Sequence, residues 1–217
     1  MTMKRLVKSI INATAAVVVF FPALCCRIAI RSIGPHEGFS GWSQFFALFP
    51  GRTGVYLRRA FYRQTMTHCD QGACITFGTI FSHPTARIGK DVYIGARCTI
   101  GDVTLEDDVL IASNVSIMNG SRQHGIERWD IPIREQPGVM EDVTIGANSW
   151  IGEGAIVGAN VGQHCIIGAG AVVTKAIPDH SIALGVPARV VKTREYDDTL
   201  KPIEQLEQLQ QLLDSAQ

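Results

Sequence analysis

Over much of its length the chain repeats a six-residue pattern, in which an aliphatic residue opens each unit and small or polar residues follow. Eight units open with Ile or Val followed directly by Gly: Ile88-Gly89, Ile94-Gly95, Ile100-Gly101, Ile145-Gly146, Ile151-Gly152, Val157-Gly158, Val161-Gly162 and Ile167-Gly168. A period of six is typical of a parallel β-helix, in which three units make one coil and the aliphatic side chains stack along the axis. The small residue beside each one lets the backbone turn without a Cβ clash. The pattern predicts a mainly β fold.

The repeat is broken by an aperiodic, polar insertion at residues 118–142. The insertion contains His124, close to Glu127 and Asp130, together with three Arg and a Trp. Coils that only stack on one another do not need such a segment, and long loops on a rigid scaffold are where binding and catalytic residues concentrate. We therefore expect this loop to carry the chemistry.

The beginning of the chain has a different pattern, an uncharged and largely apolar run from Ser9 to Cys26 with Lys and Arg on both sides. As a helix this run would span about 27 Å, slightly less than the roughly 30 Å hydrocarbon core of a bilayer. Positive charge at both ends favours keeping both ends in the cytoplasm, and Pro22 could supply the bend of a re-entrant hairpin. We interpret the segment as peripheral, monotopic or re-entrant; a full span and a cleaved signal peptide are the alternatives.

Charge divides the chain near the same place. Residues 1–63 hold nine Lys or Arg and one acidic residue, a net charge of +8, whereas residues 64–217 hold eleven basic and nineteen acidic residues, a net charge of −8. The basic part also carries aromatic residues at helix-like spacing between Phe39 and Phe49, which suit the headgroup region of a membrane with anionic lipids. Packing of this aromatic stripe on the rest of the protein is the alternative. Interleaving with a long apolar run fits lipid better than nucleic acid, so no nucleic-acid partner is expected.

Three regions are expected from these patterns. Residues 1–70 form a helical, membrane-associating region, residues 71–195 form the β-helix with its loop at 118–142, and residues 196–217 form a C-terminal amphipathic helix. The six cysteines have no zinc-like spacing and no metal is expected.

The ladder, the His-bearing loop and two closing runs resemble the hexapeptide-repeat acyltransferase family, with sugar and polysaccharide O-acetyltransferases nearest. The closing runs are residues 167–178 (IGAGAVVTKAIP) and 185–192 (GVPARVVK), and the resemblance covers roughly residues 75–195. It implies a left-handed β-helix, a homotrimer with active sites between neighbouring subunits, and acetyl-CoA as donor. The chain departs from the soluble sugar acetyltransferases in having only four residues from Val157 to Val161, and in its apolar, basic N-terminal segment.

The resemblance matches His124 to the loop histidine that acts as general base in these relatives. A sugar hydroxyl needs such a base, and neutral imidazole, with an ordinary pKa of about 6.5, is suited to the task near pH 7. Glu127 is our candidate for orienting the ring, with Asp130, Glu135 or a backbone carbonyl as competitors. His83, His164 and His180 are interpreted as structural.

Acceptor and donor contacts follow from the same resemblance. The candidates for binding the acceptor are Asn119, Arg122, Asp130 and Trp150, and Trp150 has packing against the loop as its alternative role. The candidates for binding coenzyme A are Gly168, Ala169, Gly170, Thr174, Lys175, Arg189 and Lys192. Small residues allow close backbone approach, and the cationic side chains can meet phosphates.

The function expected is transfer of acetyl from acetyl-CoA to a sugar hydroxyl of a lipid-linked glycan or polysaccharide precursor, on the cytoplasmic face of a bacterial inner membrane. Acetyl-CoA is a cytosolic metabolite, and the N-terminal segment suggests an acceptor that is itself membrane-bound. The alternatives are an acetyltransferase for a small soluble acceptor (a sugar, amino sugar, serine or antibiotic) and, outside enzymes, a membrane-docked β-helix scaffold.

Overall fold

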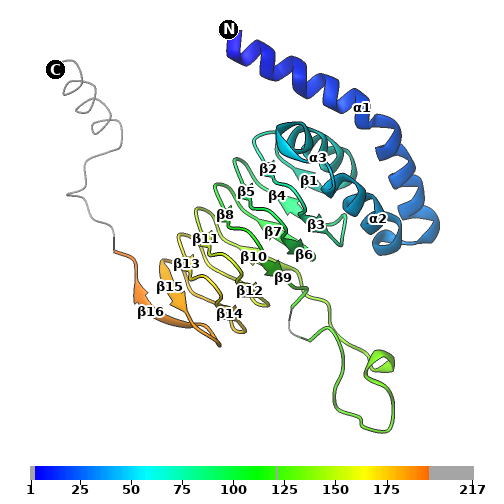
Figure 1. The fold of residues 1–217 in the computed structure, drawn as a ribbon. Coiled ribbons are helices and arrows are strands. Elements are labelled where there is room, and N and C mark those ends of the chain that lie inside the picture. Colours follow the sequence, from blue (N-terminus) through cyan, green and yellow to red (C-terminus); the bar gives the residue numbers. More distant parts are fainter. Residues whose placement is uncertain (1–2, 121, 196–217) are drawn as a thin grey trace, which may run out of the picture.

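The computed structural model describes residues 3–120 and 122–195, and the predicted C-terminal helix at 196–217 lies outside the described residues. The described chain begins with α1 (Met3–Ile33), α2 (Pro35–Ala47) and α3 (Gly51–Thr65). These helices lie at one end of a column of coils, from which a long loop leaves near the middle (Figure 1). The fold is therefore a parallel β-helix capped by helices, as the six-residue period predicts.

Within the described residues the short strands form three parallel sheets, and on sheet A the last two coils continue the row as isolated bridges at Val161 and Ile177. Sheet A contains β1 (His68–Cys69), β4 (Arg87–Ile88), β7 (Val103–Leu105) and β10 (Val143–Ile145). Sheet B contains β2 (Cys74–Ile75), β5 (Tyr93–Ile94), β8 (Leu110–Ile111), β11 (Trp150–Ile151), β13 (Ile166–Ile167) and β15 (Ser181–Leu184), and β16 (Arg189–Thr193) pairs antiparallel with β15. Sheet C contains β3 (Ile80–Phe81), β6 (Thr99–Ile100), β9 (Ser116–Ile117), β12 (Ile156–Val157) and β14 (Val172–Val173).

The second residue of most strands points into the column and is buried. On sheet B the register stacks Ile94, Ile111, Ile151 and Ile167 directly on one another, and all four are fully buried. The glycine that follows each ladder residue is needed because the coils are close: a Cβ atom on Gly95 would lie 2.5 Å from the backbone of Ala112 in the next coil. The Ile-Gly pairs thus encode both the core and the spacing between coils.

Replacing Ile111 by alanine is expected to lower the free energy of unfolding by about 2–5 kcal/mol, because the lost methyl groups leave a cavity between stacked coils. Urea denaturation would measure the loss. The matched control is Ile156→Ala, which makes the same change at an outward position of sheet C, where Ile156 precedes Val157 and is 38% exposed. Equal losses in the two variants would contradict the assignment of Ile111 to the core.

Corners between sheets A and B use residues in the left-handed conformation. Asp91, Asp108, Asn148, His164 and His180 occupy equivalent corner positions with φ from 53° to 59°. Asn, Asp and His are among the non-glycine residues that adopt this conformation most readily. The corner side chains also stack, because the rings of His164 and His180 lie 5.0 Å apart and almost parallel. The positions of His164 and His180 at these corners give both histidines a structural role in the coil.

The helices are fixed to the first coil by aromatic packing. Phe39 of α2 and Phe61 and Tyr62 of α3 are fully buried, and the Tyr62 ring lies 5.0 Å from that of Phe81 on β3. The Ser43 hydroxyl lies 2.9 Å from the Tyr62 hydroxyl and accepts a hydrogen bond from the Phe81 N–H. Of the aromatic stripe, Phe39 and Phe46 are buried, Trp42 and Phe49 are partly buried against the same core, and Phe45 is 49% exposed, so packing on the rest of the protein, the alternative, accounts for most of it.

One buried cation joins the same two units. The Arg58 side chain of α3 is fully buried and donates from Nε to the Ile75 carbonyl at 2.9 Å and from Nη1 to the Phe49 carbonyl at 2.6 Å. These bonds tie α3 both to the first coil and to the turn after α2. The helical region is thus packed on the β-helix as part of one structure.

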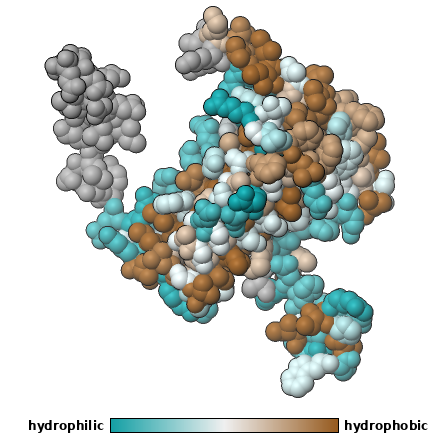
Figure 2. Space-filling view, viewed as in Figure 1, coloured by the Kyte–Doolittle hydropathy of each residue, from teal (hydrophilic) through white to brown (hydrophobic). Residues whose placement is uncertain are grey.

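Helix α1 packs on the protein along one stripe only. Ala15, Val19, Ala23 and Cys26 are buried, whereas most of the other apolar side chains of α1 are exposed and form a hydrophobic surface (Figure 2). Residues 6–33 are long and apolar enough to cross a membrane by length and composition. Pro22 lies inside α1, so the hairpin predicted at this residue is not formed; the helix continues through the proline, where a bend without a break is common.

Candidate active site

The connections from sheet C to the next strand of sheet A form one edge of the column, which we call the C–A edge (residues 82–86, 101–102, 118–142, 158–160 and 174–176). The predicted catalytic loop is one of these connections and projects away from the coils (Figure 1). Thr174 and Lys175 lie in another connection on the same edge, two coils further on. The edge therefore carries candidates for both the base and the donor site.

The base of the loop is tied to the coils and to itself. Asn119 is buried, and its side-chain oxygen accepts a hydrogen bond from the backbone N–H of Asp102 in the coil above. Across the loop, the Arg122 carbonyl accepts from the N–H of Val139 at 2.7 Å, and the Arg122 guanidinium pairs with the carboxylate of Glu141. Asn119 and Arg122, predicted as acceptor contacts, thus hold the loop in place within a single chain.

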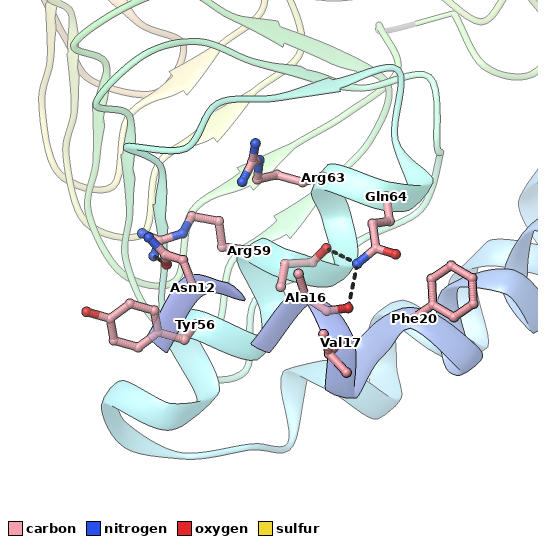
Figure 3. A pocket seen from close by; sticks show the side chains of 9 residues that line it. Asn12, Ala16, Val17, Phe20, Tyr56, Arg59, Arg63 and Gln64 are labelled. Carbon is pink, nitrogen blue, oxygen red and sulfur yellow. Dashed lines mark hydrogen bonds between the residues drawn. The ribbon is translucent and has the colours of Figure 1, made fainter. Parts of the chain in front are cut away.

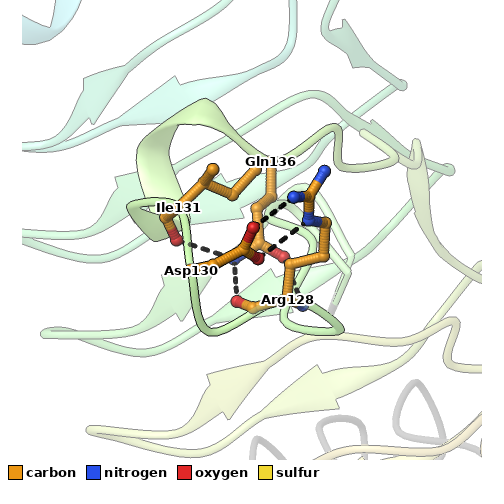
Figure 4. Close-up of polar contacts among 4 residues, drawn as sticks. All are labelled: Arg128, Asp130, Ile131 and Gln136. Carbon is orange, nitrogen blue, oxygen red and sulfur yellow. Dashed lines mark hydrogen bonds and ion pairs between the residues drawn. The ribbon is translucent and has the colours of Figure 1, made fainter.

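Further out, the loop is organised around Gln136. Its buried side chain accepts from the Arg128 N–H at 3.0 Å and donates to the carbonyls of Arg128 at 2.6 Å and Ile131 at 3.3 Å (Figure 4). The Arg128 guanidinium pairs with Asp130, and this hydrogen bond holds the pKa of the Asp130 carboxyl below its usual range. The tip of the loop is a defined turn whose ionised Asp130 already has a partner.

His124 is exposed on the loop. Its neighbour Gly125 is buried against the Pro137 carbonyl of the opposite arm of the loop, which fixes the backbone there. The Glu127 carboxylate accepts from the Ile126 N–H at 2.9 Å, and among the described residues no hydrogen bond joins it to the His124 ring. The predicted orienting contact is therefore not made within one chain.

A groove of ≈570 Å³ runs along the C–A edge below the loop. Arg122 and Glu141 from the loop base line it on one side, and Thr174 and Lys175 line it on the other. The structure thus brings the foot of the His124 loop together with two of the residues predicted to bind coenzyme A. The charged side chains of the groove are Arg122, Lys175, Glu141 and Asp142; Arg122 is paired with Glu141, so Lys175 is the cation of this lining that can meet an anionic donor.

Other predicted residues lie elsewhere on the column. Trp150 is on the outer face of sheet B, the one sheet that does not border the C–A edge, in register with Leu110 and Ile166. Gly168, Ala169 and Gly170 form the corner between sheets B and C, and Arg189 and Lys192 lie on the exposed strand β16. Within one chain the predicted site residues therefore form two separate groups, one on the C–A edge and the other on sheet B and at its corner with sheet C.

A second histidine, interpreted from the sequence as structural, lies on the same edge as the loop but does not line the groove. His83 lies on the C–A edge, where its Nδ1 is 2.8 Å from the Ser82 hydroxyl and its ring is 5.3 Å from that of His36 on α2. Burial lowers the pKa of His83, and nearby Asp102 acts in the opposite direction.

Buried thiols fill core positions instead of forming a reactive site. Cys98 and Cys165 are fully buried, and burial raises the pKa of Cys69 to about 12. In residues 3–120 and 122–195, no group of three or more His, Cys, Asp or Glu has a metal-binding arrangement.

Two family profiles match the coils on either side of the loop. Residues 85–119 match the bacterial transferase hexapeptide (six repeats), and residues 142–175 match the hexapeptide repeat of succinyl-transferase. The segment between the matches is almost the whole insertion. The profiles therefore describe the coils and do not cover the loop.

Relatives in sequence are named as acetyltransferases. Galactoside O-acetyltransferase of Escherichia coli K12 is 34% identical over 151 residues, which are 66% of this chain and 71% of that protein. The putative lipopolysaccharide biosynthesis O-acetyl transferase WbbJ of the same organism is 31% identical over 57% of this chain and 65% of its own length. The probable acetyltransferase Rv3034c of Mycobacterium tuberculosis is 35% identical, and the match covers 54% of this chain and 40% of that protein.

Solved structures agree with the sequence relatives. A galactoside acetyltransferase in complex with coenzyme A superimposes with a TM-score of 0.62 and 26% identity, covering 73% of this chain and 84% of that one. A maltose O-acetyltransferase from Clostridium difficile 630 has the same fold, with a TM-score of 0.62 and 23% identity over 72% of this chain and 87% of its own. Given these coils, the two profile matches and a relative 34% identical over most of its length, the chain belongs to the hexapeptide-repeat acyltransferase family.

Proposed function

We propose that the protein transfers the acetyl group of acetyl-CoA to a hydroxyl of a sugar carried on a lipid-linked glycan, at the cytoplasmic face of a bacterial inner membrane. The observation that carries the proposal is the groove on the C–A edge, where the foot of the His124 loop meets Thr174 and Lys175. Relatives named for acetyl transfer to galactosides, and one solved with coenzyme A bound, support the reaction class and the donor.

His124 acts as the general base in this proposal. Its neutral imidazole removes the proton from the acceptor hydroxyl while the hydroxyl oxygen attacks the thioester carbonyl. As the carbon–sulfur bond breaks, the imidazolium returns the proton to the departing thiolate, so the protein ends unchanged. Backbone N–H groups stabilise the oxyanion that forms in between. The exposed position of His124 on a firmly anchored loop supports this role.

The donor lies in the groove of the C–A edge. Lys175 supplies positive charge for its phosphates and the Thr174 hydroxyl supplies a hydrogen bond, while Arg122 in the same groove is paired with Glu141. Gly168 to Gly170 and the cations of β16 complete the donor site from the far coils. The assignment of the donor to this groove rests on the chemistry of the residues that line it.

A homotrimer would join the two groups of site residues. The outer face of sheet B carries an apolar ladder in register: Cys74, Tyr93, Leu110, Trp150, Ile166 and Ile182. The loop also exposes apolar side chains, including Trp129, which is 97% exposed. Apolar surfaces of this kind mark contacts with another protein chain. Packing of sheet B against a second subunit would place Trp150 next to a neighbouring loop.

Membrane attachment is proposed for the helical region. The exposed apolar surface of α1 suits the acyl boundary of a bilayer, and its buried stripe keeps the helix against the protein (Figure 2). The helix therefore lies along the membrane surface in a monotopic arrangement. An active site held at that surface favours an acceptor that is also in the membrane, in line with the lipopolysaccharide role in the name of WbbJ.

A small soluble acceptor is the second candidate, because galactoside and serine acetyltransferases are among the relatives. Purified full-length protein with radiolabelled acetyl-CoA would be offered a lipid-linked glycan extract, a simple galactoside or serine. We expect label in the lipid fraction at a rate at least tenfold above that for either soluble acceptor. Faster transfer to a soluble acceptor would overturn the lipid-linked assignment, and no transfer at all would leave the scaffold alternative.

A further inference from the structure

A groove of ≈590 Å³ lies between α1 and α3, away from the C–A edge (Figure 3). Its polar lining comes from Asn12, Tyr56, Arg59, Arg63 and Gln64. We propose that this groove binds the phosphate of an anionic phospholipid headgroup. The proposal rests on the membrane attachment proposed above and deepens it, since it assigns the contact to a defined site.

The first support is a guanidinium held in place without an anion. Arg59 is only 6% exposed, and it donates to the Asn12 side-chain oxygen at 2.6 Å and to the Ala73 carbonyl at 3.2 Å. Its guanidinium also lies 5.0 Å from the centre of the Tyr56 ring. All these partners are neutral, so among the described residues the charge of Arg59 has no carboxylate beside it. A nearly buried cation without a counterion is a favourable partner for a phosphate.

The second support is a row of positive charge. Arg63 follows Arg59 by one helical turn on α3, it is exposed, and it also lines the groove. A smaller hollow of ≈280 Å³ adjoins the groove through Asn12 and contains Lys8. Helix α3 carries no acidic residue. Together Lys8, Arg59 and Arg63 make a cationic row at the seam between α1 and α3.

The walls of the groove are firmly held. The Gln64 side chain donates to the Ala16 carbonyl of α1 at 3.1 Å and to the Ala60 carbonyl of α3 at 3.3 Å (Figure 3). The Arg59–Asn12 contact makes a second bridge between the same helices. The Arg59 guanidinium is therefore preorganised, which reduces the entropy lost on binding.

The apolar flank identifies the occupant as a lipid. Val17 and Phe20 line the groove from α1, and Phe20 is 62% exposed next to the hydrophobic surface of that helix. A soluble phosphate would contact only the cations. A phospholipid offers a phosphate to Arg59 and Arg63 and acyl chains to Val17 and Phe20 at the same time, so it matches both parts of the lining.

The test is sedimentation of full-length protein with vesicles of phosphatidylcholine, alone or with roughly one quarter phosphatidylglycerol. We expect phosphatidylglycerol to strengthen binding to the vesicles. Arg63→Gln should weaken the affinity for the phosphatidylglycerol vesicles about fivefold, the effect of one basic residue at an anionic surface. The matched control is Arg52→Gln, which removes the same charge from the exposed start of α3, outside the groove. We expect this control to lose less than half as much.

The outcomes separate the site from the wider proposal. Equal losses in Arg63→Gln and Arg52→Gln would overturn the site and leave general electrostatic attraction. The site would also be overturned, in favour of a soluble anion, if inorganic phosphate bound the protein without vesicles and, at concentrations set by that affinity, displaced it fully from the vesicles. Failure of the wild type to bind any vesicle would overturn membrane attachment itself. Acetyl transfer to a soluble acceptor, measured in parallel, reports separately on the enzyme.

Discussion

Substitution of His124 by alanine is expected to reduce acetyl transfer by about 10²–10⁴-fold, the usual contribution of a general base. Binding of acetyl-CoA should be unchanged, because the donor groove is lined by Thr174, Lys175 and the loop base and not by His124. Initial rates with radiolabelled donor and isothermal titration with coenzyme A would measure the two quantities. The loss should appear in kcat, since the proton is removed only in the chemical step.

His164→Ala is the control for this substitution. It removes another accessible imidazole, from a corner between sheets A and B where the ring stacks on His180. We expect its transfer rate to stay near that of the wild type. Similar losses in both variants, or retained transfer in His124→Ala, would show that the loop histidine is not the base.

The second large effect is expected from charge on the outer ladder of sheet B. Leu110→Glu places a carboxylate between Tyr93 and Trp150 in the apolar stripe, and burial of that charge against another subunit would be costly. We expect the variant to run as a monomer in size-exclusion chromatography with light scattering. Transfer should fall with it, although His124 is intact, because the two groups of site residues would no longer meet.

Leu110 is 43% exposed in the single chain, so the substitution should leave the β-helix folded, which circular dichroism would verify. Thr99→Glu is the matched control, as Thr99 occupies the equivalent outward position on sheet C. A wild-type protein that is already a monomer with full activity would contradict the shared site. So would a Leu110→Glu variant that remains trimeric.

The coils could be predicted from sequence because the six-residue period arises directly from the burial of one aliphatic side chain in each unit. An aliphatic residue every sixth position must stack on its neighbours. The step of four from Val157 to Val161 keeps this stacking, since Val161 still pairs with Ile145. The first coil carried a weaker signal. Its inward residues are Cys69, Ile75 and Phe81, which lack the Ile-Gly pair; pairing with the second coil on one side and packing of the helices on the other define their place.

The site was only partly predictable, since the loop has no period to read. The insertion was found by the break in the ladder, yet Asp130 was predicted as an acceptor contact and is paired with Arg128 within the loop. Likewise Glu127 bonds to the backbone beside it. Local hydrogen bonds of this kind depend on the turn that Gln136 organises, which no pattern of residue types specifies.

The C–A edge has a consequence for how members of this fold can diverge. Its connections take five, two, twenty-five, three and three residues, while the parallel register of the three sheets continues past each of them. The described residues of the long connection, 118–120 and 122–142, belong to no strand, so its exchange would leave every stacked row in place. Scaffold and chemistry can then be inherited separately. The loop at this edge can therefore be exchanged for that of another transferase, and specificity for a new acceptor can evolve while the β-helix stays unchanged.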